Sequence, residues 1–314
     1  MGISRAVVRL LLEEKRRQPF TGSVIQFGKQ AVYLTQAEVE HWARVHAVPL
    51  AKPSEISLSH DPALARFGCI DDRTFFSELG FSDVRSCDYA DWEGCDFTQD
   101  LNLPLRGDLK GRFDAVYDPG TIQHVFDVPQ MFLNVFDFLR VGGRAIHAMA
   151  PSQNHVDQGF FGFSPTFFWD FYTANKFRLE CLYLLEFKPL WYLGRFQPAV
   201  VKVYRYTPGS LDAVSFGGLD ASQMCVFVVA TKTAESTGHV IPQQGMFREF
   251  WPQDAPKRIH HAGLGTGADA GPLTWRERLA LNPAVAWAYL AAKRIKREVR
   301  RTFFRKMPPL VAKY

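Results

Sequence analysis

The chain has 314 residues, of which 47% are hydrophobic and 22% are charged. This composition supports one large core, or one core with an appendage, and excludes global disorder. No apolar run approaches the roughly 18 residues that cross a bilayer, and the charges within the first apolar stretch favour an amphipathic helix over a secretory signal. The five cysteines form no C-x-x-C pair and the nine histidines show no metal-ligand spacing. We therefore expect free thiols, a cytoplasmic location and no metal site.

The net charge of +5 is concentrated near the end of the chain. Between positions 290 and 306 there are eight basic residues and one acid, so this segment carries +7 and the remaining residues carry −2. The basic balance therefore belongs to the tail, which argues against nucleic-acid binding by the main domain.

In chain order, helical and strand patterns alternate up to about residue 180, and β-rich sequence follows. The expected helices cover 4–17, 35–46, 71–80, 128–139, 164–175 and 282–305. The expected strands cover 23–27, 83–87, 95–99, 113–118, 145–149, 178–187, 200–206 and 223–231. This order predicts an α/β fold: a doubly wound, mostly parallel Rossmann-like sheet with an antiparallel edge, an N-terminal helix and a C-terminal amphipathic basic helix.

The same patterns predict three parts of the chain. Residues 1–233 form the α/β domain. Residues 234–273 are rich in Gly, Pro and Gln and are expected to be an irregular linker. Residues 274–314 form a basic helical extension, in which apolar residues recur on one face and basic residues on the other.

The segment 113–149 carries the clearest functional signal. A buried strand ends at Asp118, a polar turn and a helix follow, and a Gly142-Gly143 turn leads into the next strand. This is the pattern of a βαβ unit. Ligands bind beyond the carboxyl ends of parallel strands, so we expect chemistry in the turn after Asp118.

Glycines and acids also follow the other predicted parallel strands. Gly28, Asp88 and Asp100 stand after the first, second and third strands, as Asp118 stands after the fourth. A nucleoside site needs close backbone approach and carboxylates for its hydroxyl and amine groups. The alternative interpretation is that these are ordinary turn residues, because Asp and Gly favour turns in any protein.

These segments resemble the class I S-adenosylmethionine-dependent methyltransferases, and more narrowly a divergent bacterial group associated with surface-polysaccharide and other glycan biosynthesis. The resemblance runs from about residue 8 to residue 180 and is weaker in the strand at 223–231. The segments that carry it are 22–30, 88–95, 100–102, 113–127, 142–143 and 159–165.

The resemblance implies S-adenosylmethionine as the cofactor and a glycan or other small molecule as the methyl acceptor. The turn after the first strand would approach the methionine end of the cofactor, the acid after the second strand would lie near the ribose, and the acid after the third near the adenine. The segment from Asp118 to Thr121 would form the floor beneath the sulfonium. The implied cofactor-binding residues are Gly28, Lys29, Gln30, Asp88, Tyr89, Asp100, Asp118, Gly120 and Thr121.

The sequence departs from the family pattern at three places. The first loop has the single glycine Gly28 in place of a glycine-rich run. Gln123 stands where the narrower group has Glu, and the segment 158–161 lacks the expected His and Tyr. These replacements remove groups that handle protons, and they bear on catalysis more than on the fold.

The remaining candidates concern the acceptor. His124, near the opening of a helix, is the first candidate for a general base, and His155, in the loop after the fifth strand, is the second. Each could instead be a structural histidine satisfied by its surroundings. Phe160 and Phe161 could line an acceptor pocket, because aromatic faces stack on sugar rings, although the aromatic cluster around them also suits packing against the sheet.

Two functions remain open. The first is methyl transfer from S-adenosylmethionine to an oxygen, or less favourably a nitrogen, of a carbohydrate or cell-surface precursor. The second is a methyltransferase-like scaffold without catalysis that binds a partner or membrane through its tail. The basic helix at 282–306 could lie on the anionic inner face of a membrane, pair with a partner or second copy, contact nucleic acid, or pack on the domain.

Overall fold

The structure is a computed structural model that describes residues 2–192, 195–198, 200–211, 214, 222–244, 275, 278, 281–304 and 307–314. The helices are α1 (Arg5–Arg17), α2 (Gln36–Val45), α3 (Pro62–Ala65), α4 (Asp72–Leu79), η1 (Gly107–Leu109), η2 (Ile122–His124), α5 (Val128–Phe138), α6 (Pro165–Ala174) and α9 (Pro283–Phe304). The strands are β1 (Ser23–Phe27), β2 (Asp83–Asp88), β3 (Phe97–Thr98), β4 (Phe113–Asp118), β5 (Leu139–Gln153), β6 (Arg178–Phe187), β7 (Pro189–Tyr192), β8 (Arg195–Pro198), β9 (Lys202–Arg205), β10 (Gln223–Thr231) and β11 (Leu310–Lys313).

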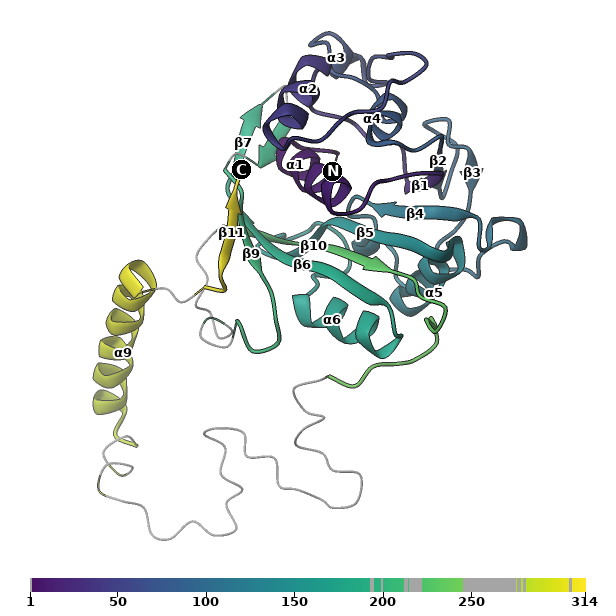
Figure 1. The fold of residues 1–314 in the computed structure, drawn as a ribbon. Helices are drawn as coiled ribbons and strands as arrows, with labels where there is room; N and C mark the ends of the chain where they lie inside the picture. Colours follow the sequence, from purple (N-terminus) through teal and green to yellow (C-terminus); the bar gives the residue numbers. More distant parts are fainter. Residues whose placement is uncertain are drawn as a thin grey trace. The chain divides into compact units, whose positions relative to one another are not determined.

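A mixed sheet forms the centre of the fold, with the strand order β11-β9-β6-β10-β5-β4-β1-β2-β3. The strands from β1 to β5 are parallel, and β10 lies antiparallel between β5 and β6. Helices α1, α2 and α4 cover one face of the sheet, and α5 and α6 cover the other (Figure 1). The predicted doubly wound, mostly parallel α/β fold is confirmed.

Local signals account for most of the element boundaries. Thr35 and Glu38 form a reciprocal capping box at the start of α2. The side chain of Asp71 accepts a hydrogen bond from the Thr74 amide at the start of α4, and Gly80 ends that helix in the left-handed conformation. The strands expected at 23–27, 178–187 and 223–231 have the predicted bounds.

The structure differs from the sequence expectations in several places, among them the short helix α3 and the strand expected at 95–99, which covers only Phe97–Thr98. Gly142 and Gly143 do not form a turn before a short strand but lie within β5, whose pairing with β4 shifts register between Phe113 and Ala115. A positive φ at Gly142 accommodates this irregularity without ending the strand. A small hairpin, β7 with β8, lies between the strands expected at 178–187 and 200–206, where the sequence predicted no further strand. The edge strand β11 was not expected at all.

The last residues of the chain return to the sheet, because β11 pairs antiparallel with β9. By its internal contacts the chain forms two units: Met1–Thr207 with Ala221–Pro242 and Pro309–Tyr314, and Pro208–Asp220 with Gln243–Pro308. The second unit contains α9, which matches the helix expected at 282–305. Within the part of the chain that the structure describes, no helix is both long and apolar enough to cross a bilayer.

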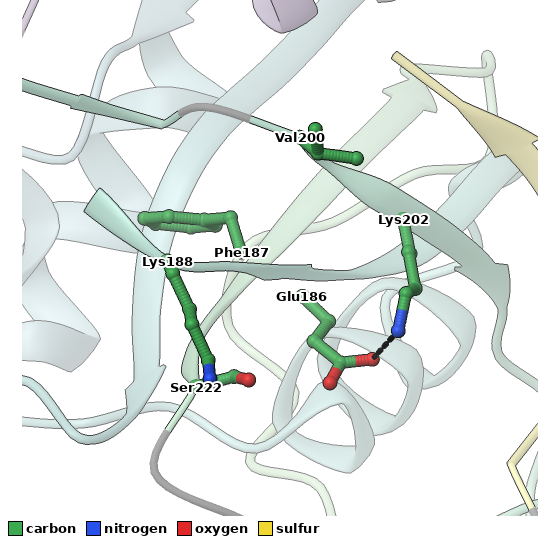
Figure 2. Close-up of a pocket in the computed structure, with 6 residues that line it drawn as sticks. All are labelled: Glu186, Phe187, Lys188, Val200, Lys202 and Ser222. Atoms are coloured by element: carbon green, nitrogen blue, oxygen red, sulfur yellow. Dashed lines mark ion pairs between the residues drawn. The ribbon is translucent and has the colours of Figure 1, made fainter. Parts of the chain in front are cut away.

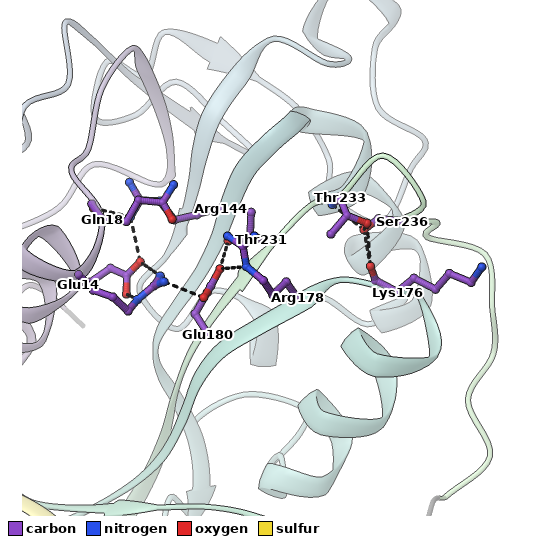
Figure 3. A network of polar contacts seen from close by, with 10 residues as sticks. Glu14, Gln18, Arg144, Lys176, Arg178, Glu180, Thr231, Thr233 and Ser236 are labelled. Carbon is purple, nitrogen blue, oxygen red and sulfur yellow. Dashed lines mark hydrogen bonds and ion pairs between the residues drawn. The ribbon is translucent and has the colours of Figure 1, made fainter.

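A buried ionic network fastens α1 to the sheet (Figure 3). Arg144 of β5 pairs with Glu14 of α1 at 2.9 Å and also donates to the Gln18 carbonyl oxygen. Arg17 continues the network to Glu180 of β6, which accepts further hydrogen bonds from Arg178 and Thr231. Because Arg178 begins β6 and Thr231 ends β10, this network lies at the edge opposite the carboxyl ends of the parallel strands. The edge at the carboxyl ends of the parallel strands carries loops and no part of this network.

Candidate functional site

The carboxyl ends of the parallel strands meet at one edge of the sheet. Phe27 of β1 lies beside Cys87 of β2, and Asp118 of β4 lies beside His147 of β5. The turns that begin at Gly28 and after Asp88, Thr98 and Asp118 therefore share this edge.

The turn after β1 brings Gly28 against Asp88. Gly28 has a φ of +73°, a conformation that favours glycine, and its amide donates to the Cys87 carbonyl oxygen at 2.7 Å. A Cβ atom at Gly28 would stand 3.4 Å from Asp88 Oδ2 and 3.7 Å from Gln30 Nε2. Gly28 and the Asp88 carboxylate are therefore close neighbours, and we call this close approach of bare backbone to a carboxylate the Gly28 cradle. Lys29 beside it is half-buried.

Asp72 holds this turn in place. Its Oδ2 accepts hydrogen bonds from Gln26 Nε2 at 2.6 Å and from the Gln30 amide at 3.0 Å. The Gln30 side chain in turn donates to the carbonyl oxygens of Phe27 and Gly28. The sequence analysis missed this role, because the Asp71-Asp72 pair reads as a helix start. In the structure the first acid caps the helix and the second turns inward.

Buried oxygen atoms at this edge lack partners within the described residues. Gln26 Oε1 and Gln30 Oε1, at the end of β1, accept no hydrogen bond, and neither does Gln123 Oε1, in the turn after β4. Such atoms are uncommon in folded proteins and call for water or a ligand group nearby. They make this edge rich in unused acceptors.

The acids after β2 and β3 are half-buried. Asp88 Oδ1 accepts from the Tyr89 amide at 2.6 Å, while the Tyr89 ring is exposed. Asp100 Oδ1 accepts from the backbone and side-chain amides of Asn102. Both carboxylates are thus oriented by local hydrogen bonds.

Asn102 joins the loop after β3 to the loop after β4. Its Oδ1 accepts from the amides of Phe126 at 3.0 Å and Asp127 at 2.9 Å. Sequence reasoning gave Asn102 no separate role. The aspartate-to-asparagine spacing in Asp100-Leu101-Asn102 is a familiar turn signal that could have indicated it.

Asp118 is fully buried, and its carboxylate is used by the protein itself. Oδ1 accepts from the amides of Gly120 at 3.0 Å and Thr121 at 2.6 Å. Oδ2 lies 2.7 Å from Nδ1 of His147, whose Nε2 lies 2.5 Å from the Tyr172 hydroxyl. The carboxylate therefore shapes the turn from behind and presents no surface of its own to solvent.

The protonation pattern of this hydrogen-bonded chain follows from its donors and acceptors. A carboxylate only accepts, so His147 Nδ1 carries a proton toward Asp118. Burial, together with Asp118, raises the pKa of Tyr172 far above its ordinary value, so the phenol keeps its proton. The Tyr172 hydroxyl therefore has a proton to donate toward His147 Nε2. Neither His147 nor Tyr172 was expected to support the site.

Thr121 ties the turn after β4 back to β1. Its hydroxyl donates to the Phe27 carbonyl oxygen at 3.3 Å, directly before Gly28. Gly120, with a φ of +111°, packs against the Gln123 side chain. The structure thus brings the turns containing Gly28 and Thr121 together, with Asp88 beside the first.

An exposed aromatic cluster lies next to the turn after β4. Phe126, Phe160 and Phe161 are 70%, 63% and 37% exposed. The Phe126 ring centre lies 5.4 Å from that of Phe160 and 6.0 Å from that of Phe161. The Phe160 amide donates to the Gln123 carbonyl oxygen, which holds this cluster beside exposed His124. Sequence reasoning named Phe160 and Phe161 but missed Phe126.

His155 has different neighbours from His124. Its Nε2 lies 3.3 Å from Cys225 Sγ of β10, and its ring centre lies 6.3 Å from that of Phe187 of β6. Burial lowers the pKa of His155, so it is neutral at pH 7. His124 Nε2 instead lies 3.2 Å from Gln123 Nε2. Of the two candidate bases, His124 directly follows the residue, Gln123, to which the Phe160 amide is hydrogen-bonded.

Metal ligation finds no support among the described side chains, since no three of His, Cys, Asp or Glu are grouped to hold an ion there.

No protein-family model matches the sequence, and no curated protein is significantly similar to it. Among solved structures, a protein from Methanococcus maripaludis described as an S-adenosyl-L-methionine-dependent methyltransferase aligns at 11% identity and a TM-score of 0.25. The alignment covers 45% of this chain and 55% of that one. A SAM-dependent methyltransferase from Thermotoga maritima aligns at 13% identity and a TM-score of 0.33, over 73% of this chain and 92% of that one.

A third similar structure is the 1,6-didemethyltoxoflavin-N1-methyltransferase of Burkholderia thailandensis, solved with bound 1,6-didemethyltoxoflavin and S-adenosylhomocysteine. It aligns at 15% identity and a TM-score of 0.33, over 73% of this chain and 77% of that one. The chain thus spans about half of the Methanococcus protein and most of the other two. Likenesses this distant do not show a shared activity.

Proposed function

We propose that this protein transfers a methyl group from S-adenosylmethionine to an acceptor. The observation that carries the proposal is the cradle in which left-handed Gly28 stands against Asp88 at two adjacent parallel strand ends. Backbone that can approach a ligand, next to a carboxylate that can accept from hydroxyl groups, suits the ribose and amino-acid ends of such a cofactor.

The chain would hold the cofactor with residues of four turns. Gly28, Lys29 and Gln30 follow β1. Asp88 ends β2 and Tyr89 follows it, and Asp100 stands after β3. After β4, Gly120 and Thr121 would lie under the reactive end, in a turn whose shape Asp118 sets from behind. The cofactor supplies an activated methyl group, so orienting the acceptor provides much of the acceleration.

For the acceptor we propose a carbohydrate or related hydroxyl-bearing molecule. The exposed rings of Phe126, Phe160 and Phe161 offer faces for an acceptor ring, and exposed His124 stands beside them. Methylation of a hydroxyl requires that its proton leave, and a neutral imidazole can accept it. His124 is the proposed base. His155, which contacts Cys225 and Phe187, is a secondary candidate and lies in the loop that also carries Phe160 and Phe161.

Cofactor binding tests the proposal directly. S-adenosylhomocysteine should raise the melting temperature of the purified protein, because a ligand at about 100 times its Kd adds roughly 2.7 kcal/mol. Asp88→Asn and Gly28→Ala should each weaken binding about tenfold or more, measured by calorimetry. Asp83→Asn, at the opposite end of β2, serves as the matched control. No binding at millimolar ligand by the wild type would refute the proposal.

A second proposed function rests on α9, which carries exposed Trp287, Tyr289 and Ile295 among its basic residues. Aromatic and basic residues on one helix favour the anionic inner surface of a membrane, which would place the protein at the cytoplasmic face. This role is compatible with the enzyme or could replace it in a non-catalytic scaffold.

Sedimentation with anionic vesicles tests this second function. The full-length protein should co-sediment, and the charge-reversed variant K293E/R294E/K296E should not. Neutral vesicles and high salt are the controls, because both should release the wild type. Full-length variants are required, since truncation before α9 would also remove β11 from the sheet. Equal partitioning of both proteins would eliminate the membrane role.

A further inference from the structure

A cavity of about 190 Å³ opens at the carboxyl end of β6 (Figure 2). Because β5 and β6 both run antiparallel to β10, the end of β6 lies at the same sheet edge as the ends of the parallel strands. The described lining residues come from β6, from β9, from the segment between these strands and from the residue before β10: Glu186, Phe187, Lys188, Val200, Lys202 and Ser222. None of them was singled out in the sequence.

The carboxylate of Glu186 is buried and is compensated by neighbouring side chains of the protein. Its side chain is 4% exposed, and it accepts a hydrogen bond from the Tyr204 hydroxyl at 2.8 Å. Its cross-strand neighbour Lys202 places Nζ 3.7 Å from the carboxylate. Figure 2 shows this ion pair on one side of the cavity. One of the two lysine charges is therefore balanced by a carboxylate that the fold holds in place.

Lys188 supplies the charge that remains. It follows directly after β6, is exposed, and makes no ion pair with another described residue. Among the lining residues that the structure describes, two ammonium groups stand against one carboxylate, which gives this described part of the lining a net charge of +1. A lining of this kind attracts anions and repels amines.

The other walls are apolar or structural. The Phe187 ring, which is 4% exposed, lies next to His155, and Val200 is half-exposed. The Ser222 carbonyl oxygen accepts from Asn154 Nδ2 at 2.7 Å. The loop after β5 thus contacts two lining residues, Ser222 through Asn154 and Phe187 through His155. Further along the same loop, Phe160 and Phe161 join the aromatic cluster.

We propose that this cavity binds a small anionic group, a carboxylate or a phosphate, carried on an apolar or aromatic stem. A cavity of roughly 150 Å³ holds benzene, so this volume suits a benzoate-sized group. That the group belongs to the methyl acceptor rests on the proposed methyltransferase function. The binding chemistry itself follows from the lining alone.

Ligand-observed NMR on the full-length protein tests the inference with benzoate, phenyl phosphate, benzylamine and benzyl alcohol at millimolar concentration. Benzoate or phenyl phosphate should bind, and whichever binds more tightly identifies the carboxylate or the phosphate as the preferred group. Benzylamine and benzyl alcohol should not bind measurably. Tighter binding of benzylamine than of both anions, or no binding by any of the four, would overturn the proposal.

Two variants assign the site. Lys188→Gln should weaken anion binding about fivefold or more, and Glu186→Gln should strengthen it, because each changes the net charge of the lining by one in opposite directions. Exposed Lys52 in a distant part of the sequence provides the control Lys52→Gln, which should change nothing. An unchanged affinity in Lys188→Gln would contradict the assignment. S-adenosylhomocysteine binding is measured on the same samples. If the anions bind but S-adenosylhomocysteine does not, the assignment of the cavity stands and the methyltransferase proposal is refuted.

Discussion

Single side chains behind the turns decide the geometry of the candidate site. Asp118 was expected to face a ligand, yet it supports the turn after β4 from the interior, together with His147 and Tyr172. Asp72 does the same for the turn after β1. Groups that touch a ligand need a rigid support, and here that support consists of buried polar residues.

Tyr172→Phe should destabilise the protein by roughly 1–3 kcal/mol, because it leaves His147 Nε2 buried without a partner. Tyr206→Phe is the matched control. The Tyr206 hydroxyl lies 2.7 Å from that of Thr166, which is on α6 like Tyr172, and this contact is less buried. That change should cost about 1 kcal/mol or less. Urea unfolding gives both values. Equal, small losses would show that the chain of hydrogen bonds behind Asp118 contributes little.

Asp96 predicts how stability depends on pH. Burial alone would raise its pKa, but the Ser86 amide, Arg73 and Arg85 together lower it. A carboxyl group whose pKa is lowered in the folded state contributes stability above its unfolded pKa, and that stability is lost as the pH falls through the folded pKa. We therefore expect the urea concentration at the unfolding midpoint to decrease when the pH is lowered below about 4. Asp96→Asn should flatten this decline, whereas exposed Asp91→Asn should leave it unchanged.

Among the elements, α1 depends most on a long-range attachment. Its apolar side is buried, but its orientation is also set by the Glu14–Arg144 pair, in which both side chains are about 5% exposed or less. The two residues lie 130 positions apart in the sequence. This pairing connects the first helix to the middle of the sheet at the edge away from the candidate site.

Arg144→Met should cost about 3–5 kcal/mol, because it leaves the Glu14 carboxylate buried without this partner. Arg178→Met, at the exposed end of the same network, should cost less than about 1 kcal/mol. Restoring most of the lost stability with Glu14→Leu in the Arg144→Met background would confirm that the buried charge is the cause. Urea denaturation of the three variants provides the comparison. Similar losses in both single variants would argue against a special role for the buried pair.

For the whole molecule, the sheet places every feature of the proposed site on one edge. The cradle at Gly28, the turn after β4, the aromatic cluster and the cavity at the end of β6 all follow carboxyl strand ends. The ionic network lies at the other edge. This separation lets the loops vary in chemistry without loss of the contacts that hold the helices to the sheet.

The sequence alone determined most of the local elements and their order, although it did not predict β7, β8 or β11. Apolar periodicity, the Thr35–Glu38 capping box and the glycine at position 80 are signals between near neighbours, so they can be recognised without coordinates. Because parallel strands align their carboxyl ends, the same patterns also indicated that Gly28 and Asp88 would be adjacent. The helix expected at 282–305 follows from its repeat of apolar residues.

Only the tertiary structure decided which polar side chains turn inward and which surfaces remain open. Asp72 and Asp118 find their partners through hydrogen bonds to residues that are distant in sequence, and no local pattern separates them from ordinary turn aspartates. Phe126 joins Phe160 only when two loops meet, and β11 becomes a strand only beside β9. Such features depend on contacts between segments far apart in the chain, whose free energy exists only after the sheet has assembled.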